Sequence, residues 1–423
     1  MTGRPTDGLL DDARGVQDDL VRLRRTLHAR PEVGLDLPHT QEAVLSSLDG
    51  LGLEISTGRR LSSVTAVLRG ARPGPTVLLR GDMDALPVAE RTGLAFASDN
   101  GAMHACGHDL HTAMLAGAAR LLAHHRDRLA GDVVLMFQPG EEGYDGARYM
   151  LEEGVLDASG TRPVAAYALH VTASGRPSGR FSARGGPTMA AVDNLYVTVR
   201  GAGGHGAMPH MAMDPVPVAC EMVLAMQTRV TRAFDVFDPV VVTTGSFHAG
   251  TQNNIIPDTA VFETTVRTFS PEARARAERA LTEACRGVAA AHGVEAEVRW
   301  RPLYPVTVND PGAVDTVART VAELFGGDGY ETLARPMTGS EDFSRVVDEV
   351  PGAMVFLGAT PPGADPGTAP DNHSPLADFD ESVLGAGAAV YAALAAGHLH
   401  GSGPGRPREP DPSGEAGRRM RRS

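Results

Sequence analysis

The sequence of 423 residues contains no lysine, so all 39 of its basic residues are arginine. This absence excludes a Schiff-base lysine, on which pyridoxal phosphate enzymes and many aldolases depend. It also excludes a phosphate-binding loop of the G-x-x-x-x-G-K-[ST] type. Aromatic residues make up only 5% of the chain, so a hydrophobic core must be built mainly from Ala, Val, Leu and Met.

Cysteine is scarce as well, because Cys106, Cys220 and Cys285 are too few and too scattered for a disulfide framework. Residues 1–12 lack the apolar core of a secretory signal. The longest run of small apolar residues, 383–397, is shorter than the ~18–20 residues that span a bilayer. We therefore expect a cytoplasmic protein with no membrane partner.

Positive charge is in deficit, since 52 acidic residues against 39 arginines give a net charge of −13. Such a surface repels nucleic acid and anionic lipid. We expect neither as a partner, and the chemistry must therefore be sought in small-molecule sites.

Strand and helix patterns alternate in the first part of the chain. We predict helices at 18–27, 40–51 (capped by Thr40), 108–124 and 146–152, and strands at 64–68, 77–79, 132–137 and 164–171. This alternation predicts an α/β domain with a mostly parallel sheet.

The pattern changes in the middle of the chain. We predict strands at 193–200, 240–247, 259–268 and 294–300, with helices at 214–232 and 271–291. This order is typical of the split βαβ, or ferredoxin-like, sandwich. The α/β pattern then resumes with a helix at 312–325, a strand at 354–357 and a helix after Asp380. The sequence therefore predicts an α/β domain in two parts (12–188 and 303–400), an inserted ferredoxin-like domain (189–302) and a disordered tail (401–423).

The segment 103–111 concentrates metal-binding side chains just before a predicted helix. Cys106 and His108 are two residues apart, and Gly107 between them allows a sharp turn. A thiolate and an imidazole at this spacing can bind one divalent ion, or two ions side by side. We expect His104 and His111 to be structural, or to support the ligands by hydrogen bonds.

Two adjacent carboxylates, Glu141 and Glu142, follow the predicted buried strand 132–137. Neighbouring residues of an extended segment point in opposite directions, so one can bind metal while the other acts as general base toward a bound water. Paired glutamates are common on surfaces, but α/β sheets place their ligands at strand ends of this kind.

Two further histidines complete a ligand set. His170 closes an apolar strand and His373 lies in a late loop, so five candidate ligands are Cys106, His108, Glu142, His170 and His373. Two divalent ions sharing a bridging water support hydrolysis, with Glu141 as the base. Asp82 and Asp84 lie near the same sheet edge and could orient a ligand histidine, or merely cap the strand. No G-x-S-x-G elbow supports a serine hydrolase.

Four motifs occur in order: LRGDMDALP (79–87), MHACGHDLH (103–111), QPGEEG (138–143) and MTGSEDF (337–343). With these, the chain resembles the dinuclear metallopeptidase and amidohydrolase family of aminoacylase and carboxypeptidase G. The Cys-Gly-His-Asp form resembles its branch of hippurate hydrolases and auxin-conjugate (N-acyl-amino-acid) amidohydrolases. The resemblance runs from about His28 to the Ala-rich final helix.

The resemblance implies roles for individual residues. It places the metal ligands on the same five residues, the base on Glu141, and two divalent ions in each subunit (Zn²⁺ or Mn²⁺, with Co²⁺ or Ni²⁺ also possible). In the inserted domain, GAGGHG (201–206) and NNIIPD (253–258) match as well. His205 would polarise the scissile carbonyl, in some members from the neighbouring subunit. Asn254, Arg267 and Gly339 would hold the substrate. Read without the resemblance, His205 and Asn254 are turn residues and Arg267 is a solvated arginine.

The resemblance also implies a metallopeptidase-like catalytic domain and a homodimer formed through the inserted lid domain. We expect an amidohydrolase that cleaves N-acyl amino acids (hippurate-like, acetyl- or indoleacetyl-amino acids). A dipeptidase or carboxypeptidase with the same site is the alternative. A non-catalytic binding homologue is a third reading, against which the intact Glu141 argues. The acyl group, the native metal and the subunit that supplies His205 stay open. Without lysine, Arg267 is the first candidate for the substrate carboxylate.

Overall fold

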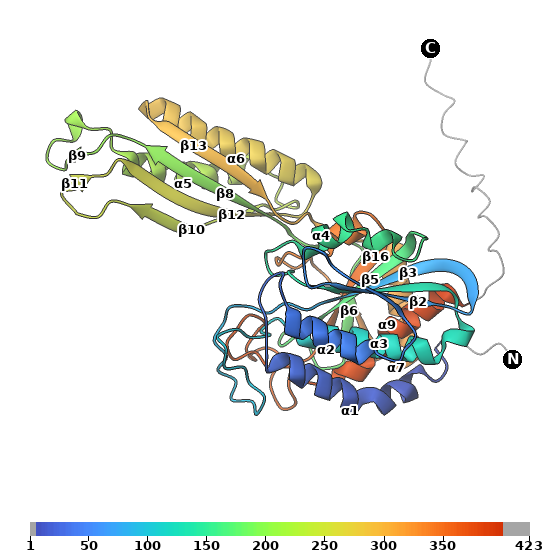
Figure 1. The fold of residues 1–423 in the computed structure, drawn as a ribbon. Helices are drawn as coiled ribbons and strands as arrows, with labels where there is room; N and C mark the ends of the chain where they lie inside the picture. Colours follow the sequence, from blue (N-terminus) through green and yellow to red (C-terminus); the bar gives the residue numbers. More distant parts are fainter. Residues whose placement is uncertain (1–5, 401–423) are drawn as a thin grey trace, which may run out of the picture.

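An eight-stranded sheet forms the centre of the larger of two bodies in the computed structural model, which describes residues 6–400 (Figure 1). Its strands, in spatial order, are β1 (Glu54–Thr57), β2 (Val64–Arg69), β4 (Ala130–Gln138), β3 (Arg72–Asp82), β5 (Pro163–Thr172), β16 (Gly352–Gly358), β6 (Phe181–Ala183) and β15 (Tyr330–Thr332). The central strands β4, β3, β5 and β16 run parallel, while antiparallel pairs join β1 to β2, β2 to β4 and β16 to β6. The body is thus mixed α/β with a mostly parallel sheet, as predicted.

Helices cover both faces of this sheet. The largest core cluster joins one face to α1 (Leu9–His28), α2 (Pro38–Leu48), α3 (His108–His124), α7 (Pro311–Phe325) and α9 (Val383–Leu399). A second cluster joins the other face to α4 (Gly146–Glu152), α8 (Ser344–Val347) and the short helix η2 (Val155–Asp157). Val77 and Leu79 pack in the first cluster and Leu78 in the second, so all three are fully buried. A strand that is buried on both faces has a continuous run of apolar residues in its sequence, and this run is the pattern that predicted the strand at 77–79.

The parallel strands bring several chain segments to one edge of the sheet. β3 ends at Asp82, β4 at Gln138 and β5 at Thr172, and the carboxyl ends of parallel strands lie together. Open α/β sheets bind their ligands beyond this edge. The candidate residues that follow these strands are therefore brought close to one another.

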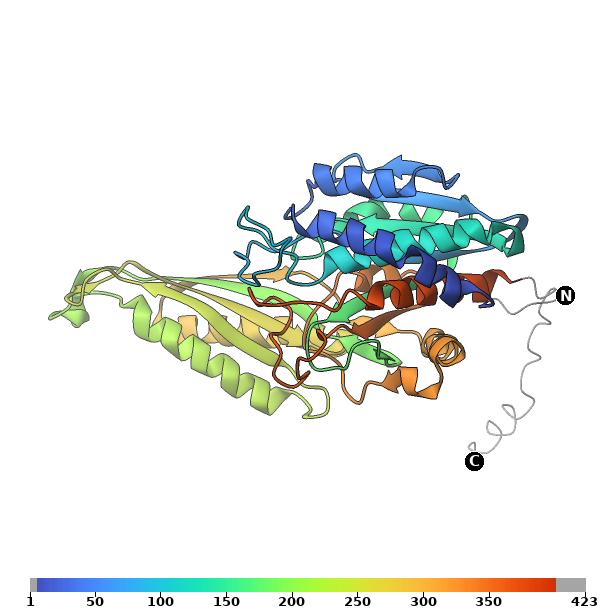
Figure 2. The ribbon, with the colours of Figure 1, turned by 90° about the horizontal axis from the view of Figure 1, so that it is seen from below.

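The second body, called the arm here, is built from β8 (Ala191–Arg200), α5 (Pro215–Ala233), β10 (Val241–Ala249), β12 (Thr259–Thr268), α6 (Pro271–His292) and β13 (Glu295–Pro302). Its sheet has the order β10-β12-β8-β13, every pair is antiparallel, and α5 and α6 share one core cluster with it. This is the strand order of the split βαβ sandwich. Figures 1 and 2 show the arm projecting from one end of the larger body. Its function as a lid or dimer interface stays a prediction.

Short elements complete the described chain. β9 (Gly204–His205) pairs with β11 (Ile255–Ile256) at the far end of the arm, and β7 (Gly186–Met189) pairs with β14 (Thr307–Asn309) in the body (Figure 1). Single 3-10 turns lie at Arg126–Arg128 (η1), Pro209–Met211 (η3) and Gly327–Gly329 (η4). No helix among residues 6–400 is long and apolar enough to cross a membrane. The expected cytoplasmic location stays a prediction, and the tail predicted at 401–423 lies outside the described residues.

The start of α2 was predicted wrongly. The helix begins at Pro38 rather than after Thr40, and Thr40 lies within its first turn. Proline is favoured at the first helical position because it has no N–H to leave unpaired. The orphan N–H groups of His39 and Thr40 instead donate to the carboxylate of Glu32, eight residues before Thr40, at 3.3 Å and 2.8 Å. A cap supplied from that distance gives no local sequence signal.

Candidate metal centre

The five predicted ligands come from four separate segments and converge at the carboxyl edge of the sheet. Cys106 and His108 lie at the start of α3, Glu142 follows β4, His170 lies in β5, and His373 lies between β16 and α9. The Cys106 Sγ atom lies 3.5 Å from His170 Nε2 and 3.3 Å from His373 Nε2. His373 Nε2 lies 3.2 Å from Glu142 Oε1, and His108 Nε2 lies 3.9 Å from the same oxygen.

These atoms form overlapping groups with the spacing of metal ligands. Within each group the potential ligand atoms lie within 4.8 Å of one another, and the groups are Cys106/His108/His170, Cys106/Glu142/His373 and His108/Glu141/Glu142. Because Cys106, His108 and Glu142 each belong to two groups, the arrangement has room for two neighbouring ions. The mixture of thiolate, imidazole and carboxylate suits divalent transition metals.

Local backbone geometry creates this cluster. Gly107 adopts a left-handed conformation (φ 84°) as the N-cap of α3, and a Cβ atom there would lie 2.3 Å from Val171 Cγ2. Only glycine fits such a position, so the sharp turn between Cys106 and His108 depends on it. His373 has φ 71°, which is uncommon for a residue with a side chain. Backbone strain of this kind persists where surrounding contacts enforce it, as they do at ligand sites.

Asn372 supplies much of that enforcement. Its Nδ2 donates to the carbonyls of Cys106 and Val171, both at 3.1 Å, and its Oδ1 accepts from the N–H of Ala173 at 2.9 Å. The N–H of His373 also donates to the carbonyl of Ala105 at 2.8 Å. The loop that carries His373 is therefore fixed to both the Cys106 turn and β5.

The histidines differ in the ring nitrogens that they leave free. His170 Nδ1 bonds to the Val171 carbonyl at 2.8 Å, which directs Nε2 toward Cys106 as an unprotonated ligand atom. His111 uses both nitrogens, since Nδ1 bonds Asp82 at 2.5 Å and Nε2 accepts from the N–H of Val171 at 2.8 Å. The buried His104 does not line the cluster, and burial lowers its pKa to about 3. The structural interpretation of His104 and His111 is consistent with these positions.

Asp82 and Asp84 support the cluster in different ways. Asp82 lies 3.5 Å from His108 Nε2 and bonds Arg80 and His111. Asp84 lies 3.4 Å from His108 Nδ1 and accepts the backbone N–H groups of Glu141 and Glu142 at 2.9 Å and 3.0 Å. Asp84 thus fixes the backbone of the loop that carries Glu141 and Glu142, a role that the sequence did not predict.

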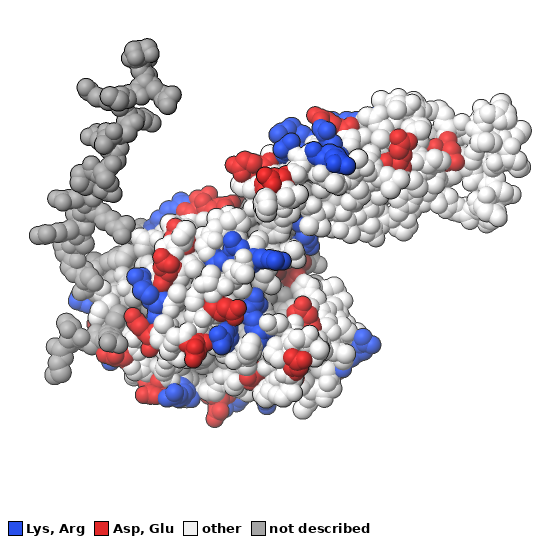
Figure 3. Space-filling model, turned by 180° about the vertical axis from the view of Figure 1, so that it is seen from behind, with Lys and Arg blue, Asp and Glu red and all other residues white. Residues whose placement is uncertain are grey.

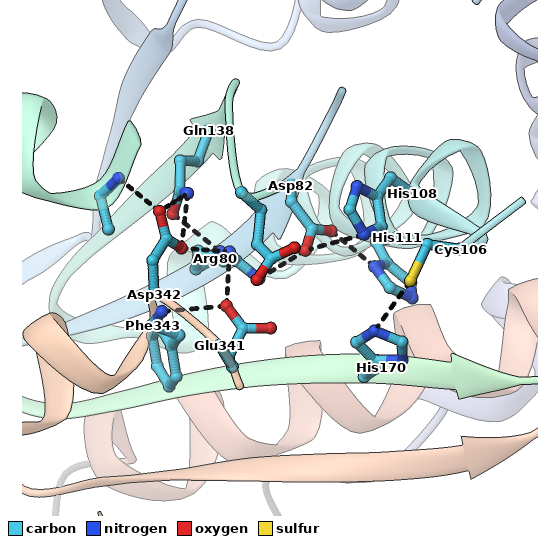
Figure 4. A network of polar contacts seen from close by, with 12 residues as sticks. Arg80, Asp82, Cys106, His108, His111, Gln138, His170, Glu341, Asp342 and Phe343 are labelled. Carbon is cyan, nitrogen blue, oxygen red and sulfur yellow. Dashed lines mark hydrogen bonds and ion pairs between the residues drawn. The ribbon is translucent and has the colours of Figure 1, made fainter. Parts of the chain in front are cut away.

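A buried network behind the cluster was also missed (Figure 4). The Arg80 guanidinium is fully buried and bonds Asp82 at 2.7 Å, Glu341 at 2.9 Å and Asp342 at 3.0 Å. Gln138 bonds both Arg80 and Asp342. The pattern Ser340-Glu341-Asp342 was visible as a motif, but nothing in its spacing linked it to an arginine far away in the sequence.

Burial and mutual repulsion raise the pKa values of several acids here. Burial, with the Glu341 and Glu142 carboxylates nearby, raises the pKa of Glu141 well above its usual range. Burial raises the pKa of Glu341 to about 8 and that of Asp342 to about 6, although Arg80 opposes both shifts. Burial also raises the pKa of the Cys106 thiol to about 12. Divalent cations would neutralise this concentration of acid groups and displace the thiol proton.

Buried polar atoms without hydrogen bonds are a second indication that these residues fit a metal centre. Both ring nitrogens of His108 and Glu142 Oε1 are buried, and although Asp82, Asp84 and His373 lie within 3.5 Å of them, none of these contacts has hydrogen-bond geometry. Buried polar atoms are nearly always paired, so orphaned ones at such a cluster point to an absent ligand. A metal ion would take the lone pair of one His108 nitrogen and that of Glu142 Oε1, while the other His108 nitrogen faces Asp84.

A cavity of about 430 Å³ opens beside the cluster, within the size range of small-ligand sites. Its polar lining includes Cys106, Glu141, Glu142, His170 and His373. Its apolar lining residues are Met189, Val192, Leu303, Met337 and Phe356, and Arg267, Gly339 and Tyr304 also line it.

The predicted substrate residues divide into two groups. Arg267 and Gly339 line the cavity, whereas His205 and Asn254 lie at the far end of the arm, where β9 and β11 pair (Figure 1). Within one chain the structure does not bring His205 or Asn254 to the metal cluster. Both are exposed there, and the N–H of Gly206 donates to the Asn254 carbonyl at 2.8 Å.

Comparison with known proteins gives consistent matches. The model of peptidase family M20/M25/M40 matches residues 78–397. A thermostable carboxypeptidase of Saccharolobus solfataricus is 38% identical over 92% of this chain and 97% of its own length. An N-acetylcysteine deacetylase of Bacillus subtilis is 36% identical (89% and 96% covered), and an IAA-amino acid hydrolase of Arabidopsis thaliana is 34% identical (90% and 86% covered).

Solved structures match over a similar extent. A Staphylococcus aureus structure described as an aminohydrolase has a TM-score of 0.85 and 32% identity, covering 92% of this chain and 99% of that one. A Bacillus subtilis structure described as a dinuclear metal binding peptidase has a TM-score of 0.77 and 33% identity, with 91% and 99% covered.

Proposed function

Because the chain belongs to peptidase family M20/M25/M40 and is a hydrolase of amide or peptide bonds, we propose that its substrates are N-acyl amino acids. Acetyl-, benzoyl- and indoleacetyl-amino acids are the substrate classes that we would test first. The deacetylase and the IAA-amino acid hydrolase among its relatives support this choice.

One observation carries the proposal: a single cavity combines the metal-ligand cluster, Glu141, an apolar wall and Arg267. An N-acyl amino acid has matching parts, namely a scissile amide, an apolar acyl or side-chain group and a free carboxylate. Ligand sites of this kind use an apolar lining for affinity and a few placed polar groups for orientation.

Cys106, His108, Glu142, His170 and His373 would hold two divalent ions, whose identity stays open between Zn²⁺, Mn²⁺, Co²⁺ and Ni²⁺. Bound there, the ions would polarise the amide carbonyl and acidify a water molecule. Glu141 would take the proton from that water and deliver it to the leaving amine. Burial and the neighbouring acids raise the pKa of this carboxylate in the metal-free protein, which favours its role as a proton acceptor.

Arg267 would bind the substrate carboxylate. Its guanidinium is half-buried, and burial lowers its pKa. One nitrogen donates to the Thr338 carbonyl at 2.9 Å, and none of the ion pairs among residues 6–400 involves Arg267. A desolvated arginine that faces a cavity without a carboxylate partner is suited to an anionic ligand.

We propose further that His205 and Asn254 act across a homodimer, because neither reaches the cavity of its own chain. The arm exposes large apolar side chains, among them Leu224 on α5 (68% exposed) and Phe237 (93% exposed). β10 is an edge strand of the arm sheet, and Figure 3 shows few charges toward the far end of the arm. An exposed strand edge and apolar residues favour pairing with a second copy.

Subunit complementation tests this assignment. Glu141→Gln and His205→Ala homodimers should each be inactive or nearly so, and mixing the subunits should restore activity at one site per heterodimer. Absence of restoration, despite subunit exchange verified by mass, would place His205 in its own site or outside catalysis.

A carboxypeptidase or dipeptidase is the second candidate, favoured by the 38% identity with a thermostable carboxypeptidase. The same metals, Glu141 and Arg267 would serve it. The two functions differ at the other end of the substrate, where a peptide carries a charged amine or further residues and an acyl group does not.

A substrate panel with metal removal and restoration tests the proposal. Chelation should abolish hydrolysis of N-acyl amino acids and a divalent ion should restore it, with higher kcat/KM than for dipeptides of the same C-terminal residue. A preference for the dipeptides would establish the second candidate. No turnover of any amide with two ions bound would contradict both.

A further inference from the structure

The two chain connections between body and arm touch the loops that line the cavity. The incoming connection reaches Val192 in β8 and the outgoing one leaves β13 at Pro302, followed by Leu303 and Tyr304. The two connections bond each other, since the N–H of Val192 donates to the Tyr304 carbonyl at 3.0 Å and that of Leu303 to the Val192 carbonyl at 3.2 Å. We call this paired segment the hinge strip. Any rotation of the arm relative to the body must pass through it.

Tyr304 links the hinge strip to the loop of Glu141. Its side chain is 3% exposed, and its hydroxyl donates to the backbone carbonyl of Glu141 at 2.6 Å while accepting the N–H of Asp145 at 3.2 Å. The Glu141 carbonyl also accepts from the N–H of Gly143 at 2.7 Å. Since Asp84 binds the N–H of Glu141, this residue is held on one side by the body and on the other by the hinge strip.

Arg345 makes a second link between the same two segments. It donates from Nε and Nη2 to the Asp145 carboxylate, and its Nη2 also donates to the Leu303 carbonyl at 2.9 Å. Asp145 is one of two described non-glycine residues with positive φ, at 61°. The loop that ends there is thus held in an uncommon conformation by bonds that begin in the hinge strip.

We propose that Tyr304 is a positioning residue that transmits the orientation of the arm to Glu141. The inference rests on the proposed role of Glu141 as general base. The arm itself places Arg267 in the cavity, so its orientation determines both where the substrate carboxylate is bound and where the base stands. Because the Tyr304 hydroxyl links the Glu141 loop to the hinge strip, the base keeps its position relative to the bound substrate.

Tyr304→Phe tests the proposal, because it removes the hydroxyl and leaves the ring to fill its buried space. Loss of this link should lower kcat about three- to tenfold, with KM and metal content unchanged. Amide hydrogen exchange should become faster both at residues 141–147 and at the hinge-strip positions that carry an amide hydrogen, namely Val192, Leu303 and residue 304.

Tyr167→Phe is the matched control. Tyr167 is also a buried tyrosine of the body, and its hydroxyl bonds His398 at 2.8 Å, away from the Glu141 loop. This variant should lose stability without loss of kcat and without faster exchange at either segment. Combining Tyr304→Phe with Arg345→Met should lower kcat by less than the product of the single effects, since both act on one link.

Unchanged kcat and unchanged exchange in Tyr304→Phe would overturn the proposal, as would an equal loss of kcat in Tyr167→Phe. If the wild-type protein cleaves no amide at all, the proposed function fails and exchange alone decides the coupling. Faster exchange at both segments would then support it, and unchanged exchange at either one would overturn it.

Discussion

Replacing Arg267 with methionine should remove the preference for a free carboxylate in the substrate. Methionine keeps much of the side-chain volume in the cavity but cannot donate hydrogen bonds. In the structure one guanidinium nitrogen donates to the Thr338 carbonyl, and Arg267 lines the cavity.

The magnitude follows from the kind of bond that is lost. A hydrogen bond to a charged partner contributes about 1.5–3 kcal/mol, which corresponds to about a 10- to 150-fold change in kcat/KM. Because Arg267 is only half-buried, solvent screens its interaction with a carboxylate, and the effect is expected in the lower part of this range. Arg267→Lys should retain part of the effect, since an ammonium group keeps the charge but not the planar fork.

The assay compares an N-acyl amino acid with its C-terminal carboxamide. The wild type should prefer the acid by the factor above, and Arg267→Met should lower kcat/KM for the acid while leaving that for the amide nearly unchanged. Arg299→Met is the control, because Arg299 lies on β13 of the same arm sheet, over the Tyr196 ring and outside the cavity. An equal loss on acid and amide in Arg267→Met would refute the carboxylate assignment.

Three further predictions concern metal affinity and stability. Cys106→Ser replaces a thiolate ligand by a hydroxyl and should weaken metal binding at least about tenfold in competition with a chelator; unchanged binding would remove Cys106 from the ligand set. Asp109→Asn removes the buried carboxylate 2.8 Å from Arg24, whose remaining carboxylate partner is Glu381 at 3.2 Å, and should lower the free energy of unfolding by about 1.5–3 kcal/mol in urea titration. Asp11→Asn at an exposed pair should lower it by less than about 1 kcal/mol. In the metal-free protein, burial raises the pKa of Glu341 from 4.5 to about 8, so the folded state binds this proton more tightly than the unfolded state. The free energy of unfolding should therefore fall as the pH rises from about 4.5 to 8. Glu341→Gln should flatten that fall, and an unchanged pH profile in the variant would contradict this prediction.

The convergence of Cys106, His108, Glu142 and His170 was predictable because each of these candidate ligands lies next to a strand or helix end, whereas His373 lies in a long loop between β16 and α9. Cys106 and His108 flank a glycine, and Glu142 follows a buried strand, so residue type and local pattern were enough. Their convergence followed from one rule, that parallel strands present their carboxyl ends at the same edge.

The supporting contacts were not predictable in the same way. Arg80 and Glu341 are 261 residues apart in sequence and meet only because β3 and the loop before α8 pack together. Likewise, the side chain of Tyr304 has no pattern that marks it as a partner of Glu141. The spacing of apolar residues indicates which face of a helix or strand a residue occupies, but not which residue far away in the sequence it will contact.

The position of the arm explains why His205 and Asn254 do not lie at the metal cluster of their own chain. The motifs at 201–206 and 253–258 lie together through the pairing of β9 with β11, which the sequence analysis did not predict. Their separation from the metal cluster depends on how the arm is oriented on the body, which no periodicity encodes. This separation is the reason for the proposal that His205 acts from a second subunit.

The central claim is that metal ions and Glu141 together perform the hydrolysis, and Glu141→Gln tests it most directly. Metal content and turnover of N-acyl amino acids should be measured on the same preparations of wild type and variant. Two divalent ions per subunit are expected in both proteins, with loss of turnover only in the variant. Full turnover by Glu141→Gln with two ions bound would contradict it.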